Sequence, residues 1–321
     1  MNANLTTDSH NGYCIAKPGR DALENIILED ETLRDGLQLE EKLLSLEQKI
    51  EILRLLVEAG VRRIQVGSFV HPKLMPQMAD TDELISRIPK YPDLLITGLI
   101  LNDKGLDRAL KCGLGHVSMS VSASDTHSRK NSNFSAAEAL ASMTGLIKSA
   151  TASGLDVRAG VQCAFGCVYE GKIQEDKVIN AFEAMASAGA IELNMADTTG
   201  MANPKQISQM IRRLKEALPD CILSLHLHDT RGLGLANMFA GYEAGVRIFD
   251  VSTGGLGGCP FVKGAAGNVA TEDAVNLFSQ MNVKTGINLE KLYLATRKLE
   301  EILRKQLHSR IYKVFQVMGH V

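Results

Sequence analysis

The sequence lacks an apolar run long enough to cross a bilayer as a helix, so we expect no membrane partner. Its first residues, MNANLTTDSHNGYC, contain no basic segment followed by an apolar core, and we therefore expect no secretory signal peptide. Charge of one sign is not in excess either, because 35 Lys and Arg residues stand against 37 Asp and Glu residues. Since no basic field is present to attract phosphates, nucleic acid is not an expected partner.

Cysteine is scarce, and the six residues, at positions 14, 112, 163, 167, 221 and 259, do not have zinc-ribbon spacing. Reduced thiols in a cytoplasmic protein are the simplest interpretation. A chain of 321 residues, of which 45% are hydrophobic, can bury a large core without disulfides. Cys163 and Cys167 could form a redox pair, but packing of one and a loop position for the other is the favoured interpretation.

Short β-rich segments alternate with longer amphipathic stretches along most of the chain. The segments are residues 26–31, 63–69, 94–101, 116–123, 156–163, 190–196, 222–228 and 247–252. The stretches between them, such as 44–60 and 203–220, carry apolar residues at helical spacing. Eight rounds of this alternation predict an α/β fold, a parallel sheet closed into a (β/α)8 TIM barrel. An open doubly wound sheet is disfavoured, because no G-x-G-x-x-G follows the first strand.

The chain is predicted to form one catalytic domain, residues 21–321, preceded by a flexible polar arm, residues 1–20. From about residue 270 the alternation stops, and residues 288–307 are expected to be helical and to pack on the barrel. No low-complexity segment divides the chain. The fold prediction is therefore a barrel with additional C-terminal helices.

In such a barrel the active site lies where the strands end at their carboxyl termini. There the sequence gathers polar and ionisable residues, whereas most strand interiors are expected to be apolar. The candidates, in chain order, are Arg34, Asp35, Gln65, Asp197, His226, His228, Cys259, Asn268 and Glu272.

His226 and His228 are separated by one residue, so in a strand both side chains face the barrel mouth. Two neutral imidazoles side by side suit a divalent metal, and Asp35 and Asn268 can add oxygen ligands. This donor set suits Mg²⁺, Mn²⁺ or Zn²⁺, and its lack of a thiolate disfavours a structural zinc site. An H-x-H pair alone is more often hydrogen-bonded than metal-bound, but the shared rim favours the metal.

The other candidates have plainer interpretations. Asp197 could cap a turn or helix, Arg34 could form a surface ion pair with Asp35, and Cys259 could be an inert small residue. The glycine-rich setting of Cys259, in GLGGCP, argues instead for a mobile and exposed position.

The polar segment 124–135 is expected to form a loop after the fourth strand. Its Arg129 and Lys130 could contact an anionic arm of a substrate, or they could be solvated. We expect His116 and His127 to bind no metal.

Six segments carry a family resemblance. They are RDGLQ (34–38), SFVHPKLMPQMAD (68–80), RKNSNFS (129–135), CAFGCVYEGKI (163–173), HLHDTRGLGLAN (226–237) and GGLGGCPFVKGAAGNVATED (254–273). In this order they resemble the 3-hydroxy-3-methylglutaryl-CoA lyase family, which belongs to the metal-dependent lyase and Claisen-type TIM barrels with a pyruvate carboxyltransferase-like domain. The last segment is the most specific.

The resemblance implies a divalent-metal enzyme that cleaves a 3-hydroxyacyl-CoA by retro-Claisen chemistry. The family reaction yields acetyl-CoA and acetoacetate, so an acyl-CoA is the implied partner. The implied cofactor is Mg²⁺ or Mn²⁺, with Zn²⁺ as an alternative. The metal ligands would be Asp35, His226, His228 and Asn268.

The resemblance also implies roles at the reacting atoms. Arg34 would stabilise enolate charge at the thioester carbonyl. Asp197 and His226 would transfer protons. Cys259 would be the acid or base of a mobile loop, and Glu272 would support that loop.

The sequence departs from the family pattern at Gln65, where the pattern has a glutamate. Glutamine keeps the size and an acceptor oxygen but has no charge, and its amide cannot act as a base. EDETLRDG (29–36) and, in part, SASDTHSRKN (122–131) are closer to related condensing enzymes such as isopropylmalate synthase. Two alternatives therefore stay open: a carbon–carbon-forming transferase or aldolase acting on a 2-oxo acid, and a catalytically altered barrel.

The length of the chain favours the lyase, because about 50 residues after the barrel leave little room for the accessory domain of a condensing enzyme. A homodimer is expected, with the C-terminal helices as one source of an interface. The family's mitochondrial leader is absent, which suits a bacterial cytoplasmic protein.

Overall fold

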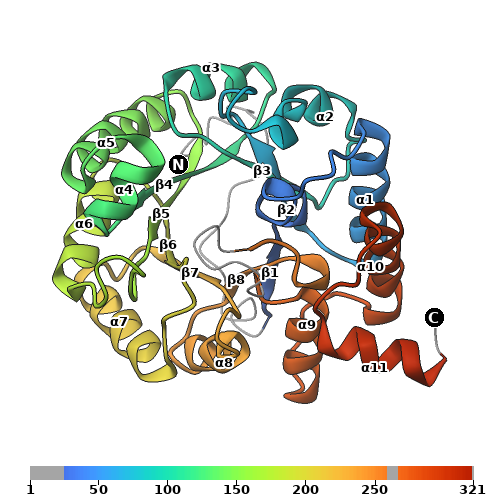
Figure 1. Cartoon of the computed structure of the whole chain (residues 1–321). Helices are drawn as coiled ribbons and strands as arrows, with labels where there is room; N and C mark the ends of the chain where they lie inside the picture. Colours follow the sequence, from blue (N-terminus) through green and yellow to red (C-terminus); the bar gives the residue numbers. More distant parts are fainter. Residues whose placement is uncertain (1–24, 259–266, 320–321) are drawn as a thin grey trace, which may run out of the picture.

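The structure, a computed structural model, describes residues 25–258 and 267–319 (Figure 1). The predicted N-terminal arm and Cys259 lie outside these residues. Eight parallel strands form a closed barrel in chain order, and the last pairs with the first. The strands are β1 (Ile27–Asp30), β2 (Arg63–Ser68), β3 (Leu95–Leu99), β4 (His116–Ser122), β5 (Asp156–Gln162), β6 (Glu192–Asp197), β7 (Ile222–Leu227) and β8 (Ile248–Val251). The prediction of a TIM barrel is confirmed.

Helices occupy the connections and surround the sheet (Figure 1). They are α1 (Leu46–Ala59), α2 (Thr81–Arg87), α3 (Asp103–Lys111), α4 (Asp125–Ser132), α5 (Ala136–Ala152), α6 (Glu175–Ser187), α7 (Pro204–Ala217), α8 (Gly234–Glu243) and α9 (Thr271–Gln280). Helix α1 shows how local sequence sets such bounds. It begins at a capping box of Ser45 and Gln48, and it ends at Gly60, whose φ of 104° favours glycine.

Short helical turns follow several strands: η2 (Thr32–Gly36) after β1, η3 (Pro76–Met78) after β2 and η4 (Thr253–Gly255) after β8. Segment 124–135, expected to be a loop, contains α4 instead. The Ser124 hydroxyl accepts from the His127 backbone N–H at the start of α4, and Asn133, at a φ of 63°, ends it. The prediction was wrong because α4 has almost no apolar residues, so no helical periodicity marks it.

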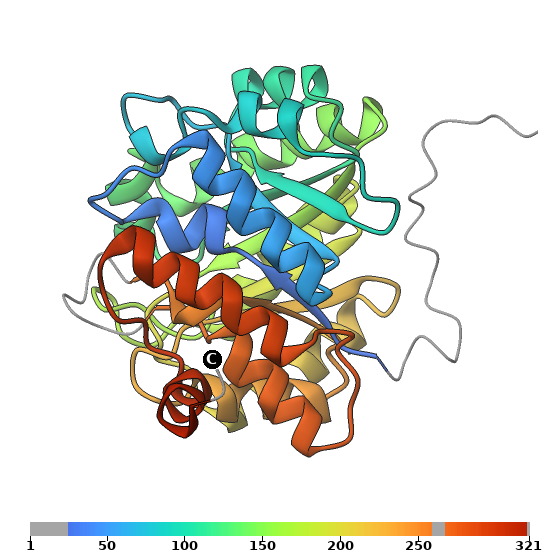
Figure 2. The same ribbon diagram turned by 90° about the vertical axis from the view of Figure 1, so that its right-hand side faces the viewer.

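The C-terminal helices are α10 (Leu289–Leu303) and α11 (Arg310–Met318). Helix α10 lies along α1, and α11 projects beyond the barrel (Figures 1 and 2). The Asp273 carboxylate holds the start of α11, because it accepts from the Ser309 hydroxyl at 2.9 Å and from the backbone N–H of Ile311 at 2.9 Å. The prediction of additional C-terminal helices is confirmed. None of the helices in the described part of the chain is long and apolar enough to span a membrane.

The barrel interior corrects the expectation of apolar strand interiors. In β2, Ile64 joins the apolar core between sheet and helices, whereas Arg63 points inward and its Nη2 donates to Glu192 at 2.8 Å. Arg158 in β5 donates to Glu29 at 2.6 Å and also to Asp250. These side chains are almost fully buried. Buried charges are tolerated when they are paired and hydrogen-bonded, and the closed barrel supplies that pairing.

The cysteines agree with the interpretation as thiols. Cys112, Cys163, Cys167 and Cys221 form no disulfide within the described residues. Cys163 and Cys167 are both buried, and both lie in the connection between β5 and α6, which agrees with the expectation of packing and a loop position.

Candidate metal and active site

The two histidines of the H-x-H pair lie at the carboxyl end of β7. Their Nε2 atoms are 3.0 Å apart, and the His228 Nε2 is 3.7 Å from Asp35 Oδ2. Asp35 lies in η2, directly after β1. One ligand atom from each residue lies within 4.8 Å of the others. The closed barrel thus brings together side chains that lie far apart in the sequence.

Asn268 completes this group from the segment that leads into α9. Its Nδ2 donates to Asp35 Oδ2 at 2.8 Å and to the Leu256 carbonyl at 3.1 Å. Its Oδ1 is buried and has no hydrogen-bond partner among the described residues. A buried acceptor without a donor, next to two imidazole nitrogens and a carboxylate, is the arrangement that a cation satisfies. These four residues therefore fit a divalent metal.

Two carboxylates contact the Nδ1 side of the His226 ring. Its Nδ1 is 3.1 Å from Asp250 Oδ2 and 3.4 Å from Glu31 Oε2. Although burial opposes protonation, these hydrogen bonds raise the pKa of His226 to about 10. A metal at Nε2 would displace the proton of that nitrogen, and an Nδ1–H that faces carboxylates is the usual support of a ligating histidine.

Sequence reasoning missed Glu31 and Asp250. Both lie at or next to the ends of strands and face the barrel interior, Glu31 two positions after the buried Glu29. Their signal was the alternation itself, since positions two apart in a strand share a face. It was discounted because the interior was expected to be apolar.

The charges connected to this site do not cancel. Within the described residues, the ion pairs link three guanidinium groups with five carboxylates, so the formal charge is −2 when the imidazoles are neutral. A divalent cation at the mouth would neutralise the cluster. The guanidinium groups are those of Arg34, Arg63 and Arg158, and the carboxylates are those of Glu29, Glu31, Asp35, Glu192 and Asp250.

Arg34 is held beside the metal group. Its Nε donates to Gln65 Oε1, its Nη1 donates to Asp35 Oδ1 at 2.5 Å, and its Nη2 donates to Glu31 Oε2. The side chain is only 13% exposed. Although burial raises it, the charge of Arg34 holds the pKa of Asp35 well below its usual range. Arg34 and Asp35 are therefore a partly buried pair at the mouth, 13% and 15% exposed, and the interpretation as a surface ion pair is wrong.

Asp197 lies at the end of β6 and is buried. Its carboxylate accepts from the backbone N–H of Met201 at 2.8 Å and of Ala202 at 3.1 Å. Burial raises its pKa to about 6 although these hydrogen bonds lower it. The turn-capping interpretation thus describes its contacts, while its pKa suits a group that exchanges a proton near neutral pH.

Glu272, in the first turn of α9, holds the start of the glycine-rich segment after β8. Its two carboxylate oxygens accept from the Gly254 backbone N–H at 3.0 and 2.9 Å, and Thr296 Oγ1 donates to it. Gly254 has a φ of 66°, and a Cβ there would lie 2.4 Å from Leu307 Cδ1. Glu272 therefore fixes one end of the segment that contains Cys259.

Arg129 and Lys130 lie on α4 and not in the metal group. Arg129 is exposed, and its Nε donates to Asp125 one turn earlier at 2.8 Å. The Lys130 Nζ lies 5.0 Å from the centroid of the Tyr169 ring. The neighbouring His127 is buried, with Nδ1 3.0 Å from Ser122 Oγ.

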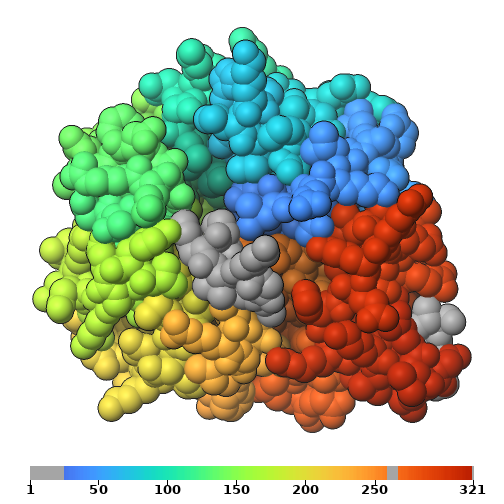
Figure 3. Space-filling model, in the orientation of Figure 1, coloured from blue at the N-terminus to red at the C-terminus, as the bar shows by residue number. Residues whose placement is uncertain are grey.

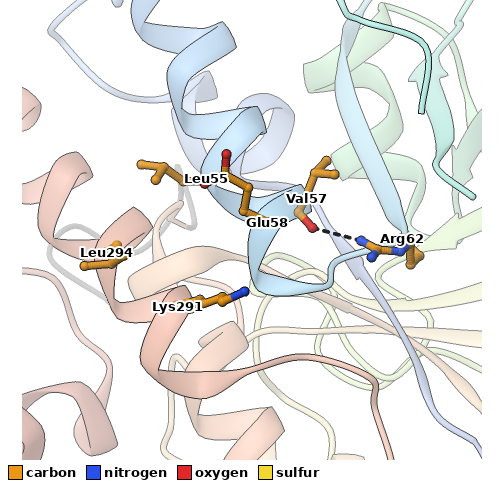
Figure 4. Close-up of a pocket in the computed structure, with 6 residues that line it drawn as sticks. All are labelled: Leu55, Val57, Glu58, Arg62, Lys291 and Leu294. Carbon is orange, nitrogen blue, oxygen red and sulfur yellow. Dashed lines mark hydrogen bonds between the residues drawn. The ribbon is translucent and has the colours of Figure 1, made fainter.

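Two other surface features lie outside the metal group. The segment after β1 and the C-terminal region lie side by side on one face (Figure 3), where Lys305 Nζ is 2.5 Å from Glu40 Oε1. A groove lies elsewhere, between the last turns of α1 and the start of α10 (Figure 4). Its Arg62 precedes β2, so the groove lies at the amino ends of the strands, and its lining includes none of the predicted site residues.

Comparison with known proteins identifies the family. The HMGL-like family model matches residues 25–299. The chain belongs to the HMGL-like family. It is 40% identical over 283 residues to the hydroxymethylglutaryl-CoA lyase YngG of Bacillus subtilis, an alignment that covers 88% of this chain and 95% of that protein. It is also 36% identical over 309 residues to the (R)-citramalyl-CoA lyase of Chloroflexus aurantiacus, covering 93% of this chain and 98% of that one.

Among solved structures, the HMG-CoA lyase of Acinetobacter baumannii, in complex with coenzyme A and 3-methylmalate, superposes with a TM-score of 0.85 at 37% identity. The superposition covers 91% of this chain and 95% of that chain. The family resemblance inferred from the sequence is confirmed.

Proposed function

We propose that this protein is a divalent-metal-dependent carbon–carbon lyase that cleaves a 3-hydroxy-3-methylacyl-CoA by retro-Claisen chemistry. The observation that carries the proposal is the group formed by Asp35, His226, His228 and Asn268, with its unpaired amide oxygen, beside the fixed charge of Arg34. The barrel and its C-terminal helices are proposed to act as one catalytic domain.

The relatives' names point to two substrates of one chemical class. Hydroxymethylglutaryl-CoA and citramalyl-CoA both carry a tertiary hydroxyl and a methyl group on the carbon β to the thioester carbonyl, and the latter is shorter by one methylene. The first is our primary candidate. The second is supported by the Chloroflexus relative and by EDETLRDG, because its cleavage would release a 2-oxo acid.

The proposed reaction removes the hydroxyl proton, breaks the bond between the α and β carbons, and protonates the resulting thioester enolate to give acetyl-CoA. When bound, a divalent cation supplies Lewis acidity that lowers the pKa of the substrate hydroxyl. Asp197 is the proposed acceptor of that proton, because its pKa of about 6 leaves it largely ionised at neutral pH. Arg34 would stabilise the enolate oxygen with a charge that does not titrate.

The roles of His226 and Cys259 differ in their support. The His226 ring is oriented as a ligand, with Nδ1 toward Asp250 and Glu31, and this supports metal binding more directly than the proton transfer also assigned to it. Cys259 lies outside the described residues, and we propose it as the acid that protonates the enolate carbon, since a thiol pKa of about 8.5 suits that transfer.

A homodimer is proposed through the C-terminal helices. Val314, Val317 and Met318 on α11 are exposed, Val317 by 89%, so the helix carries apolar surface away from the barrel. Light scattering of the purified protein would test it, and a monomer would contradict it. Cytoplasmic location stays a prediction, tested by cell fractionation.

The test of function is acetyl-CoA release from each of the two acyl-CoA substrates with Mg²⁺ or Mn²⁺. The second product assigns the substrate, because acetoacetate arises from one and pyruvate from the other. Cleavage that a chelator abolishes, at about 1–10³ per second, supports the proposal. If folded, metal-loaded protein releases acetyl-CoA from neither substrate, the lyase proposal is wrong, and condensation on 2-oxo acids becomes the reaction to assay.

A further inference from the structure

The guanidinium of Arg34 depends on three side chains for its position. Two of its partners are carboxylates, Glu31 and Asp35, and the third is the neutral amide of Gln65. Asp35 also faces His228 and Asn268 as part of the metal group. Of the two carboxylates, Glu31 is therefore the one outside the proposed metal ligands.

Gln65 is fixed as an amide. Its Oε1 accepts from Arg34 Nε, and its Nε2 donates to Ser118 Oγ at 3.0 Å. It is 1% exposed, and these two hydrogen bonds hold it between η2 and β4. This residue positions the guanidinium but supplies no negative charge to it.

Glu31 supplies that charge at another nitrogen of the same guanidinium. It is 1% exposed, and its Oε2 accepts from Arg34 Nη2. The other cation near it, Arg158, is 3.9 Å from its Oε1 and is already paired with Glu29 and Asp250. Without Glu31, Arg158 would still pair with Glu29 and Asp250. Arg34 would keep only one carboxylate partner, Asp35, which is also a proposed metal ligand.

We propose that Glu31 is the positioning residue of Arg34, and that it supplies the buried negative charge that the neutral amide of Gln65 does not. A carboxylate at position 65 could then replace the one at position 31, because both side chains hydrogen-bond to the same guanidinium. The proposal rests on the proposed function, because Arg34 acts there on the enolate. A carboxylate at both positions would add a buried like charge beside Glu31 and Asp250, which is unfavourable.

The experiment compares four proteins: wild type, Glu31→Gln, Gln65→Glu and the double variant. Glu58→Gln on α1 is the control, because Glu58 is an exposed carboxylate that pairs with Arg54 one turn away, outside the barrel interior. Thermal unfolding of the metal-free proteins, Mn²⁺ affinity by electron paramagnetic resonance, and kcat and KM are measured for each.

We expect Glu31→Gln to lower kcat on the order of tenfold to a hundredfold, because a displaced guanidinium no longer meets the developing charge. KM and Mn²⁺ affinity should change much less than kcat. Gln65→Glu alone should lower both kcat and the melting temperature. The double variant should recover most of both, so the two substitutions are coupled and not additive.

Three results would overturn the proposal. A gain of activity in Gln65→Glu alone would show that Glu31 does not replace the missing charge. If the loss of kcat in the double variant equals the product of the two single losses, the two positions act independently, and a carboxylate at one does not replace a carboxylate at the other. If Mn²⁺ affinity falls as much as kcat, Glu31 acts by orienting His226 and not by positioning Arg34.

The unfolding measurement separates this proposal from the proposed function. It needs no substrate, so coupled melting temperatures support the charge exchange even if neither acyl-CoA is cleaved. Additive melting temperatures in an active lyase would refute the exchange and leave the function standing. If Glu31→Gln does not fold, refolding of the double variant supports the exchange and its failure to fold refutes it.

Discussion

The two ends of the barrel interior are both polar and buried, but their charges are arranged for different purposes. Toward the amino end, Arg63 and Arg158 lie against Glu29 and Glu192, and cations face anions directly. At the mouth, acceptors converge on one another, and Asn268 Oδ1 has no donor among the described residues. The amino end is thus arranged as a network of ion pairs, whereas the mouth also holds the group of acceptors that we propose as a cation site.

Removal of a ligand should have the largest effect on activity. We expect His228→Ala to lower kcat/KM by more than about a hundredfold, since residues that only orient ligands are worth 10–100-fold. Bound metal should fall with it, measured by elemental analysis of the purified protein. His71→Ala, which changes an exposed histidine outside the metal group, is the control. Full metal content with lost activity would assign His228 to the reaction and not to the metal.

Removal of a cation from the amino end of the barrel interior should lower the free energy of unfolding. Arg63→Met leaves Glu29 and Glu192 without one cation, and an uncompensated buried charge costs about 3–5 kcal/mol. Denaturant unfolding at neutral pH measures the loss. A change below about 1 kcal/mol would show that these carboxylates take up protons or water, and the contrast between the two ends would fail.

The pH dependence of turnover should reflect Asp197. Its folded pKa, about 6, is raised above the ordinary value, so the folded state holds the proton more tightly and stability falls as pH rises from about 4 to 6. Turnover should rise over the upper part of that range, because the ionised form accepts the proton. Asp197→Asn keeps an acceptor for the backbone N–H groups.

We expect that variant to lose the acidic limb of the kcat profile and to be more stable than wild type at pH 8, by no more than about 3 kcal/mol. Equal kcat profiles for the two proteins would remove Asp197 from the proton transfer.

The smallest effect is expected outside the barrel. Arg129→Ala should change kcat/KM by less than about twofold, because an exposed pair one turn apart on a helix contributes about 0.3–0.5 kcal/mol. Lys130→Ala is its matched partner. A clear rise in KM for the acyl-CoA in either variant would instead support their contact with an anionic arm of the substrate.

The sequence predicted what repeats locally. All eight strands are present, since each carries its own β-rich segment, and His226 and His228 were found because they share one strand face. What it could not show is pairing across the barrel. Arg63 and Glu192 are separated by 129 positions, and the sequence around either residue does not predict that they pair. Glu31 was missed because the barrel interior was expected to be apolar, and its partners in β5, β7 and β8 lie far along the chain.

The first turn of α9 connects two segments of the chain through hydrogen bonds. Glu272 fastens the beginning of the glycine-rich segment, and the next residue, Asp273, fastens the beginning of α11. Two adjacent carboxylates therefore anchor the start of the glycine-rich segment and the start of α11 to the same half-turn of backbone. A change at α11, by truncation or by a bulky fusion, is expected to reach the backbone that follows β8.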